Sequence, residues 1–222
     1  MSGQGAQGDR PFELGGVNHL ALVCRDMART VEFYTTVLGM PLVKTIELPF
    51  GLGQHFFFDC GGGDTLAFFW FPDAGEPVTG VTGPRVRPDT GTLTSAIGSM
   101  NHVAFTVPAE RIDEYRDRLV AAGVEVSEVA NHDDSEIGIA AEVHPGVFVR
   151  SIYFCDPDGI LLEFLAVCEN NQRTVLALTF AECLVRRANR LRDVRAAARD
   201  DVRVQLPQRL AHRTEIRRER RL

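Results

Sequence analysis

The chain has 222 residues, of which 45% are hydrophobic and 24% charged, which indicates a soluble globular domain large enough to bury a core. No apolar run approaches the ~20 residues that a helix needs to span a bilayer, so we expect no membrane partner. The five cysteines form no Cys-x-x-Cys pair. We therefore expect neither a disulfide framework nor a zinc cluster, and place the protein in the reducing cytoplasm.

The net charge of −6 is distributed unevenly along the chain. Residues 1–169 carry 10 of the 24 basic residues and 24 of the 30 acidic residues, and residues 170–222 carry the rest. We predict a flexible leader at 1–14, without the apolar stretch of a signal peptide, then a domain at 15–169 and an Arg-rich tail, helical or disordered, at 170–222. A basic amphipathic helix can bind nucleic acid or acidic membrane. A solvated or disordered tail is the preferred interpretation, and we do not expect a nucleic-acid partner.

One segment of the chain occurs twice. Val17–Val23 (VNHLALV) recurs within Met100–Val107 (MNHVAFTV), and each copy alternates in polarity as a half-buried strand does. Apolar residues at helical spacing follow each copy. They predict helices over about residues 26–38 and 112–122, the first capped by Asp26 and the two ended by Gly39 and Gly123.

Further strand patterns complete each copy, so that the repeating unit is βαβββ. The predicted strands are Leu42–Leu48, His55–Asp59 and Thr65–Phe71 in a first module of about 15–72, and Val124–Val129, Phe148–Phe154 and Ile160–Val167 in a second of about 99–167. The segment Pro72–Ser99 is long for a loop and predicts a crossover or lid.

Two histidines occupy equivalent places in the repeat. His19 and His102 lie on the first strand of each copy, and Ala21 and Ala104, two residues further on, leave space on the same face. A single histidine of this kind is more often a satisfied core residue than a ligand. The internal repeat makes the pair a candidate metal site.

Glu163 lies inside an otherwise apolar strand, Ile160–Val167. A bare carboxylate buried there would cost several kcal/mol, so a cation must compensate it. An ion pair with Arg150, or a position at a sheet edge, is the alternative to a metal. Two histidines and one carboxylate with open positions suit Fe(II) and O2 chemistry, with Mn(II) or Zn(II) as alternative ions.

These residues resemble the vicinal-oxygen-chelate superfamily, which includes glyoxalases, fosfomycin-resistance transferases, bleomycin-binding proteins and extradiol dioxygenases. The resemblance covers about residues 15–167 and implies an α+β fold in which two βαβββ modules form an open, cup-shaped mixed sheet. His19, His102 and Glu163 match the ligand positions of that family. The fourth position aligns with Ala67, which cannot bind a metal, and this argues against glyoxalase-type isomerases, which use four protein ligands.

A longer pattern is similar to the signature of one-domain type I extradiol dioxygenases. His144 is followed by Tyr153, by Asp156–Gly159 (DPDG) and by Glu163 at spacings that the signature allows, while Glu142 departs from it. The resemblance implies that His144 and Tyr153 hydrogen-bond the oxygens of a substrate and assist proton movement. A loop position for His144 and a core position for Tyr153 are the structural alternatives.

The acid–base histidine of many extradiol enzymes is missing here. Asp64 stands at its position, and Asp64 itself or the nearby His55 is the expected substitute. His132 is a further candidate, although a capping or solvent-exposed loop is its preferred interpretation.

We predict that the protein cleaves a small catechol-like aromatic with O2, in the catabolism of aromatic compounds, as a homodimer. Aromatic residues at 56–58 and 68–71 are compatible with an apolar pocket, although core packing explains most of them. The alternatives are a glyoxalase- or epimerase-like lyase or isomerase, a Mn(II) thiol transferase of the fosfomycin-resistance type and a non-catalytic drug-binding protein. The predicted domain has no cluster of Lys and Arg that could bind a phosphonate, which argues against the fosfomycin-resistance type.

Overall fold

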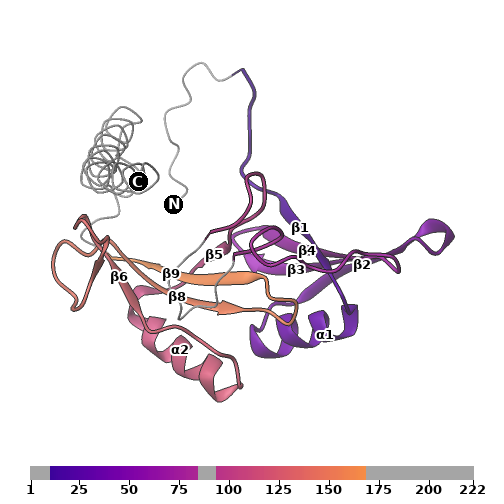
Figure 1. Ribbon diagram of the computed structural model, residues 1–222. Helices are drawn as coiled ribbons and strands as arrows, with labels where there is room; N and C mark the ends of the chain where they lie inside the picture. The colour runs from indigo at the N-terminus through magenta and orange to yellow at the C-terminus, as the bar shows by residue number, and fades with distance from the viewer. Residues whose placement is uncertain (1–10, 85–93, 169–222) are drawn as a thin grey trace, which may run out of the picture. The chain divides into compact units, whose positions relative to one another are not determined.

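The computed structural model describes residues 11–84 and 94–168, which belong to one compact unit that ends at Asn171 (Figure 1). The predicted tail and most of the predicted leader lie outside the described residues, so those boundaries stay predictions. Within the described ranges, no helix has both the length and the apolar character needed to cross a membrane.

The first module is a four-stranded sheet with the order β1-β4-β3-β2. Strand β1 (His19–Cys24) pairs in parallel with β4 (Asp64–Trp70), and β3 (Gly53–Gly61) and β2 (Leu42–Leu48) extend the sheet antiparallel. A short 3₁₀ turn, η2 (Pro49–Gly51), joins β2 to β3. The remaining elements are the helix α1 (Met27–Glu32) and its π-helical continuation η1 (Phe33–Val37).

The second module repeats this plan with the strand order β5-β9-β8-β6-β7. Strand β5 (Val103–Thr106) pairs in parallel with β9 (Leu161–Val167), as β1 does with β4. The other elements are η3 (Ala109–Arg111), α2 (Ile112–Ala121), β6 (Ala130–His132), β7 (Ile139–Ala140) and β8 (Val149–Cys155). The predicted α+β fold of two βαβββ modules is confirmed.

One predicted strand is wrong. Residues 124–129 form no strand, and only an isolated bridge joins Val126 to Phe154. The side chain of Ser127 accepts a hydrogen bond from the Tyr153 amide at 2.9 Å, and such side-chain bonds to the backbone compete with a regular ladder. The strand therefore begins only at Ala130 and forms a small hairpin with β7, which the sequence did not predict.

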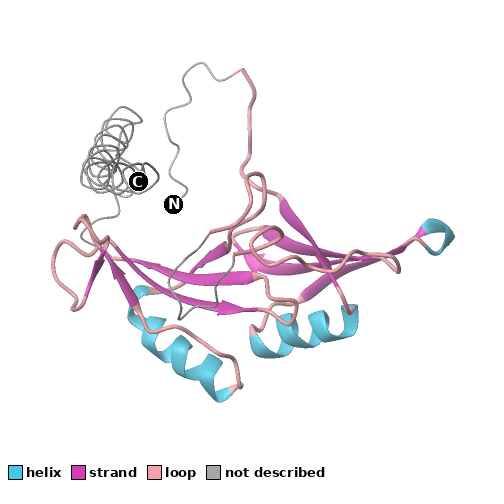
Figure 2. Ribbon diagram, in the orientation of Figure 1, coloured by secondary structure: helices cyan, strands magenta, loops and turns pink. Residues whose placement is uncertain are grey.

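The helices cover one side of the sheets and supply the core (Figure 2). Asp26 caps α1 as predicted and accepts hydrogen bonds from the amides of Ala28 and Arg29 at 2.9 and 3.2 Å. Tyr34 and Ile112, one from each helical segment, are fully buried in a single core cluster that spans both modules. The opposite face of each sheet is therefore available for other functions.

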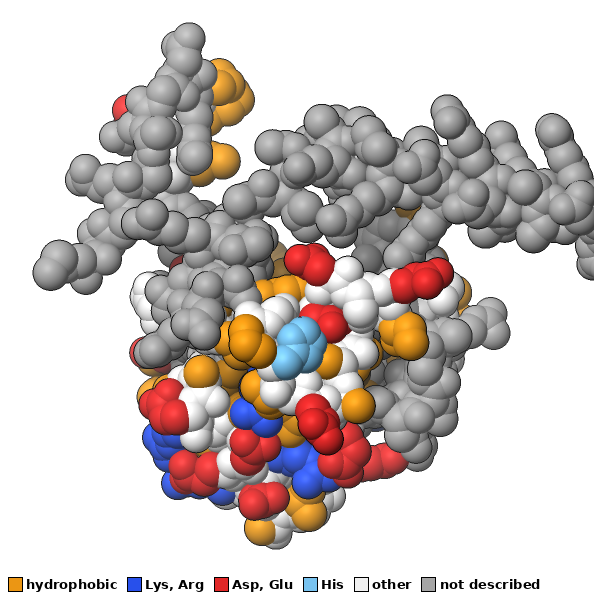
Figure 3. Space-filling view, turned by 90° about the vertical axis from the view of Figure 1, so that its left-hand side faces the viewer, with side chains coloured by type: hydrophobic (Ala, Val, Ile, Leu, Met, Phe, Trp, Pro, Cys, Tyr) orange, Lys and Arg blue, Asp and Glu red, His pale blue; other side chains and the backbone are white. Residues whose placement is uncertain are grey.

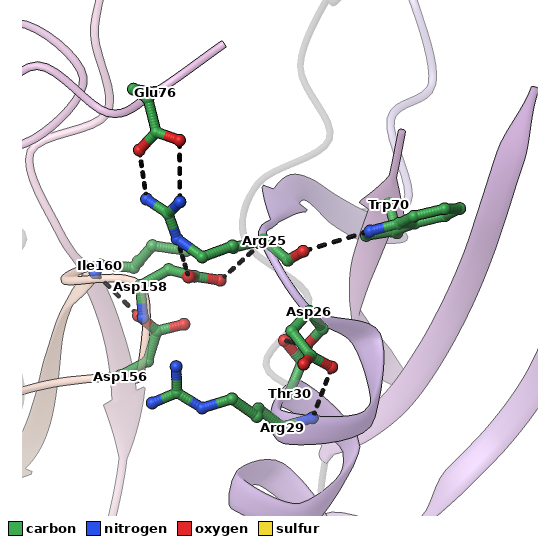
Figure 4. Close-up of polar contacts among 9 residues, drawn as sticks. All are labelled: Arg25, Asp26, Arg29, Thr30, Trp70, Glu76, Asp156, Asp158 and Ile160. Carbon is green, nitrogen blue, oxygen red and sulfur yellow. Dashed lines mark hydrogen bonds and ion pairs between the residues drawn. The ribbon is translucent and has the colours of Figure 1, made fainter. Parts of the chain in front are cut away.

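The Asp156–Gly159 turn, between β8 and β9, connects the second module to the first (Figure 4). The amide of Arg25 donates to Asp158 at 3.0 Å, and the guanidinium of Arg25 pairs with Glu76. The hydroxyl of Tyr34 donates to Asp156 at 3.2 Å, and Asp156 also accepts from the amides of Asp158 and Ile160. The turn therefore links the two modules through polar contacts.

We expect Asp156 to make the fold less stable as the pH rises from about 4 to about 6. The side chain is 6% exposed, and burial raises its pKa from 3.8 to about 6 against the opposing hydrogen bonds from the amides of Ile160 and Asp158. A raised pKa favours folding at low pH, and this contribution is lost as the pH rises through about 6. The full contribution of Asp156 to the free energy of unfolding is about 3 kcal/mol, because one pKa unit corresponds to about 1.4 kcal/mol.

Asp156→Asn keeps a carbonyl oxygen for the two amides and removes the titration. Between pH 4 and 8 the free energy of unfolding of the wild type should fall relative to this variant, as urea unfolding can measure. Parallel pH profiles for the two proteins would contradict the assignment.

Candidate metal centre

Strand register brings polar side chains together on the open face of the second module. Glu163 on β9 pairs with Ala104 on β5 and with Tyr153 on β8. Side chains that pair across strands lie on the same face, and Ala104 is too small to cover its neighbour. Glu163 is 4% exposed although it lies on the open face.

His102 faces this carboxylate directly, with its Nε2 atom 2.9 Å from Oε2 of Glu163. Its Nδ1 atom lies 2.8 Å from Oδ1 of Asn101, and the amide nitrogen of Asn101 donates to the Ser95 hydroxyl at 3.3 Å. Since the Asn101 oxygen can only accept, Nδ1 of His102 must carry a proton. In a neutral imidazole, Nε2 is then the free lone pair.

The geometry therefore opposes two acceptors, the Nε2 lone pair of His102 and the Glu163 carboxylate. Such a pair is stable only if a cation lies between them, either a second proton on the imidazole or a metal ion. A neighbouring carbonyl that fixes the histidine tautomer and leaves Nε2 free is the usual support of a histidine ligand. These residues thus fit a divalent metal ion by the chemistry of their donor atoms.

The electrostatics of this group favour an ionised carboxylate beside a protonated phenol. Burial alone would raise the pKa of Glu163, but the neighbouring His102 outweighs it and holds the pKa below its ordinary value. Burial and the charge of Glu163 raise the pKa of Tyr153 to about 12. Tyr153 is therefore a hydrogen-bond donor at neutral pH.

His19 has the same local support on the first module. Its Nδ1 atom lies 2.9 Å from Oδ1 of Asn18, and its exposed ring contacts Phe57 and His55 at centroid distances of 5.6 and 6.5 Å. Among the described residues, however, no three His, Cys, Asp or Glu side chains of one chain are close enough to share a metal ion. Within one chain, His19 is thus separate from the His102–Glu163 pair.

The register also shows that the first module has no carboxylate at the position equivalent to Glu163. Ala67 pairs with Ala21 and with Phe57, as Glu163 pairs with Ala104 and Tyr153. Ala67 is therefore the structural counterpart of Glu163, as the sequence alignment of the two copies predicted.

The structure separates the predicted acid–base candidates of the first module. His55 shares the open face with His19 and stacks on Phe69 at a centroid distance of 3.6 Å. Its Nε2 atom is buried and has no hydrogen-bond partner among the described residues. Burial, then the nearby His19, lower the pKa of His55. Asp64 lies on the helix-facing side of β4, so it is not brought to this group.

His144 and Tyr153, expected to act together, are not in contact. The side chain of His144 is 47% exposed and lies 3.2 Å from Asp133, while its Nδ1 accepts from the amide of Gly146. His132 takes the place beside Tyr153 instead, with Nε2 3.4 Å from the hydroxyl. The Asn-His pair at 131–132, the same dipeptide as at both candidate ligands, was the available sequence signal.

On the described part of the face in Figure 3, acidic and basic side chains are interspersed and no broad basic patch forms.

The fold is a two-module α+β protein whose sheets carry the candidate residues His19 and Glu163 on β1 and β9, with His102 directly before β5. Residues 16–164 match the family described as the Glyoxalase/Bleomycin resistance protein/Dioxygenase superfamily. The chain belongs to this superfamily, whose members typically use a divalent metal ion and a small-molecule substrate.

Two relatives of known name have different named activities. The chain is 27% identical over 150 residues to "Metallothiol transferase FosB" of Shouchella clausii, covering 68% of this chain and 79% of that protein. It is 28% identical over 117 residues to "Putative ring-cleaving dioxygenase MhqE" of Bacillus subtilis, covering 51% of this chain but only 33% of that protein. A glyoxylase/bleomycin resistance protein/dioxygenase domain from Frankia sp. EAN1pec shares the fold, with a TM-score of 0.50 at 20% identity over 71% of this chain and 95% of that one.

We expect metal content to depend on the three candidate ligands. His19→Ala, His102→Ala and Glu163→Ala should each lower the bound divalent metal of purified protein, because each removes a donor atom. Glu136→Ala, in an exposed loop, is the matched control and should keep wild-type content. Elemental analysis measures all four variants, and equal metal content throughout would rule out this ligand set.

Proposed function

We propose that the protein holds one divalent metal ion per site through His19, His102 and Glu163, and that two copies of the chain build each site. The main support is the distance of 2.9 Å between Nε2 of His102 and Oε2 of Glu163. Two hydrogen-bond acceptors this close need a cation between them. When bound, the ion supplies Lewis acidity and open coordination positions for the neighbouring oxygens of a substrate. Fe(II) is the preferred ion, with Mn(II) and Zn(II) as alternatives.

The incomplete sites of one chain support a homodimer. His19 is exposed on the first module, whereas Glu163 and His102 belong to the second, and among the described residues of one chain no three possible ligands come together. A two-fold axis that sets the first module of one copy against the second of the other would create two identical sites. Each would contain His19 from one chain and the His102–Glu163 pair from the other.

The preferred reaction is the cleavage of a small aromatic diol by O2. Both oxygen atoms enter the product, the ring bond beside the hydroxyl pair breaks, and no external reductant is needed. The first module offers an aromatic wall, including Phe57 and Phe69 beside His55, that can pack on an apolar ring. Tyr153 can donate a hydrogen bond to a substrate oxygen, and His55, with its lowered pKa, can accept a proton.

A thiol transferase is the second candidate. Its support is the likeness to the metallothiol transferase, which extends over 79% of that protein, and the contact of His144 with Asp133 instead of Tyr153, which departs from the extradiol expectation. The same three ligands would serve this reaction.

Subunit complementation tests the shared site. His19→Ala and Glu163→Ala chains each destroy both sites of their own homodimers, but a mixed dimer keeps one intact site. Random co-assembly should therefore restore about a quarter of the wild-type metal content, since half of the dimers are mixed and each has one of two sites. The combination of His102→Ala with Glu163→Ala is the matched control and should restore nothing. No recovery in the first mixture would contradict the dimeric site.

Oxygen consumption separates the two reactions. The protein loaded with Fe(II) under anaerobic conditions should take up O2 with a catechol panel and form a yellow ring-fission product. Tyr153→Phe should keep its metal and lose most turnover, because its hydroxyl serves substrate and not metal. Anaerobic consumption of a thiol with an epoxide substrate, without oxygen uptake, would favour the transferase.

A further inference from the structure

His132 lies on a rigid part of the second module, within reach of the candidate metal centre. On β6, His132 pairs with Val149 of β8 and with Ile139 of β7. The His132 carbonyl accepts a hydrogen bond from the Phe148 amide at 3.0 Å. Next to it, Asn131 is buried and is held by Arg150 at 3.2 Å. The backbone on both sides of His132 is thus fixed by the sheet.

The hydroxyl of Tyr153 stands between two neighbours with different hydrogen-bonding capacity. One is the carboxylate of Glu163, the cross-strand partner of Tyr153 in the sheet, which as an anion can only accept a hydrogen bond. The other is Nε2 of His132, 3.4 Å away, which donates or accepts according to the tautomer. A phenol has one proton, so both contacts are satisfied only if Tyr153 donates toward Glu163 and accepts from Nε2–H of His132.

We infer that His132 is a positioning residue that directs the hydroxyl proton of Tyr153 toward the metal centre. This inference rests on the proposed metal site, where a substrate oxygen would lie close to Glu163. With His132 in the Nε2–H form, the proton of Tyr153 points to that side. With His132 absent, the hydroxyl is free to rotate and donates there only part of the time.

The same observations separate His132 from His144, the residue that the extradiol spacing selected. His144 is bound to Asp133, on the loop that follows His132. Asp133 also accepts from the amide and hydroxyl of Ser135, so this loop has its own closed set of hydrogen bonds. The hairpin therefore presents His132 to Tyr153 and keeps His144 at the surface.

Nitrogen NMR of the histidine-labelled full chain tests the hydrogen bond without any substrate. The spectrum is recorded with and without Zn(II), and the signal lost in His132→Gln assigns the residue. We expect a protonated Nε2 in His132 whose shift changes in Tyr153→Phe and stays constant in Glu136→Gln. A bare Nε2, or a signal insensitive to Tyr153→Phe, would overturn the inference whatever the reaction proves to be.

Kinetics test the positioning role in the metal-loaded protein. His132→Phe should keep the metal content and lower kcat about 10- to 100-fold with little change in KM, as loss of an outer hydrogen-bond partner typically does. His132→Gln can donate from a similar position and should recover most of kcat. The double variant His132→Phe/Tyr153→Phe should be no slower than Tyr153→Phe alone, because the two changes remove the same interaction.

His144→Gln provides the competing outcome. A loss of kcat there, with His132→Phe at the wild-type rate, would assign the role to His144 and overturn the inference. If no substrate class turns over at all, the proposed reaction fails, while the NMR result still decides the contact between His132 and Tyr153.

Discussion

The site depends on one ionised carboxylate in an apolar strand. Transfer of a bare carboxylate into such surroundings costs several kcal/mol, and the neighbours of Glu163 that offset this cost are His102 and the cross-strand residue Tyr153. Those partners can only be reached because Ala104, its neighbour in the sheet, has almost no side chain. The requirement to compensate one buried charge thus determines which residues surround it and leaves room for a cation.

The two modules have the same architecture but different chemistry at equivalent positions. Glu163 and Tyr153 of the second module correspond by register to Ala67 and Phe57 of the first. One module therefore offers a charged, hydrogen-bonding surface and the other a mainly aromatic one. A substrate held between two such surfaces would have an apolar ring on one side and vicinal oxygens on the other, which suits the class of substrate proposed.

Short-range sequence patterns were sufficient to predict the fold. They were not sufficient to predict the contacts between residues that are distant in the sequence. Alternation after Val17 and Met100 identified the repeat, and the apolar context of Glu163 identified a charge that needed compensation. Spacing along the chain could not distinguish His132 from His144, because a small hairpin decides which of them returns to Tyr153. Nor could it predict that Asp64 faces the helix side, which depends on where β4 begins.

The Asp156–Gly159 turn, a weak signal in sequence, controls the orientation of Glu163. A slip of one residue in β9 would turn every side chain to the opposite face and place the carboxylate against the helix-side core. Asp156 opposes that slip because it accepts from the amides of Asp158 and Ile160 just before β9 begins, while Gly159 adopts a φ of 82°. The hydrogen bond from Tyr34 ties this turn to the first module. The contact that joins the modules is therefore the one that fixes the face on which the ligand lies, so a change in the junction should disturb metal binding even though no residue in it touches the ion.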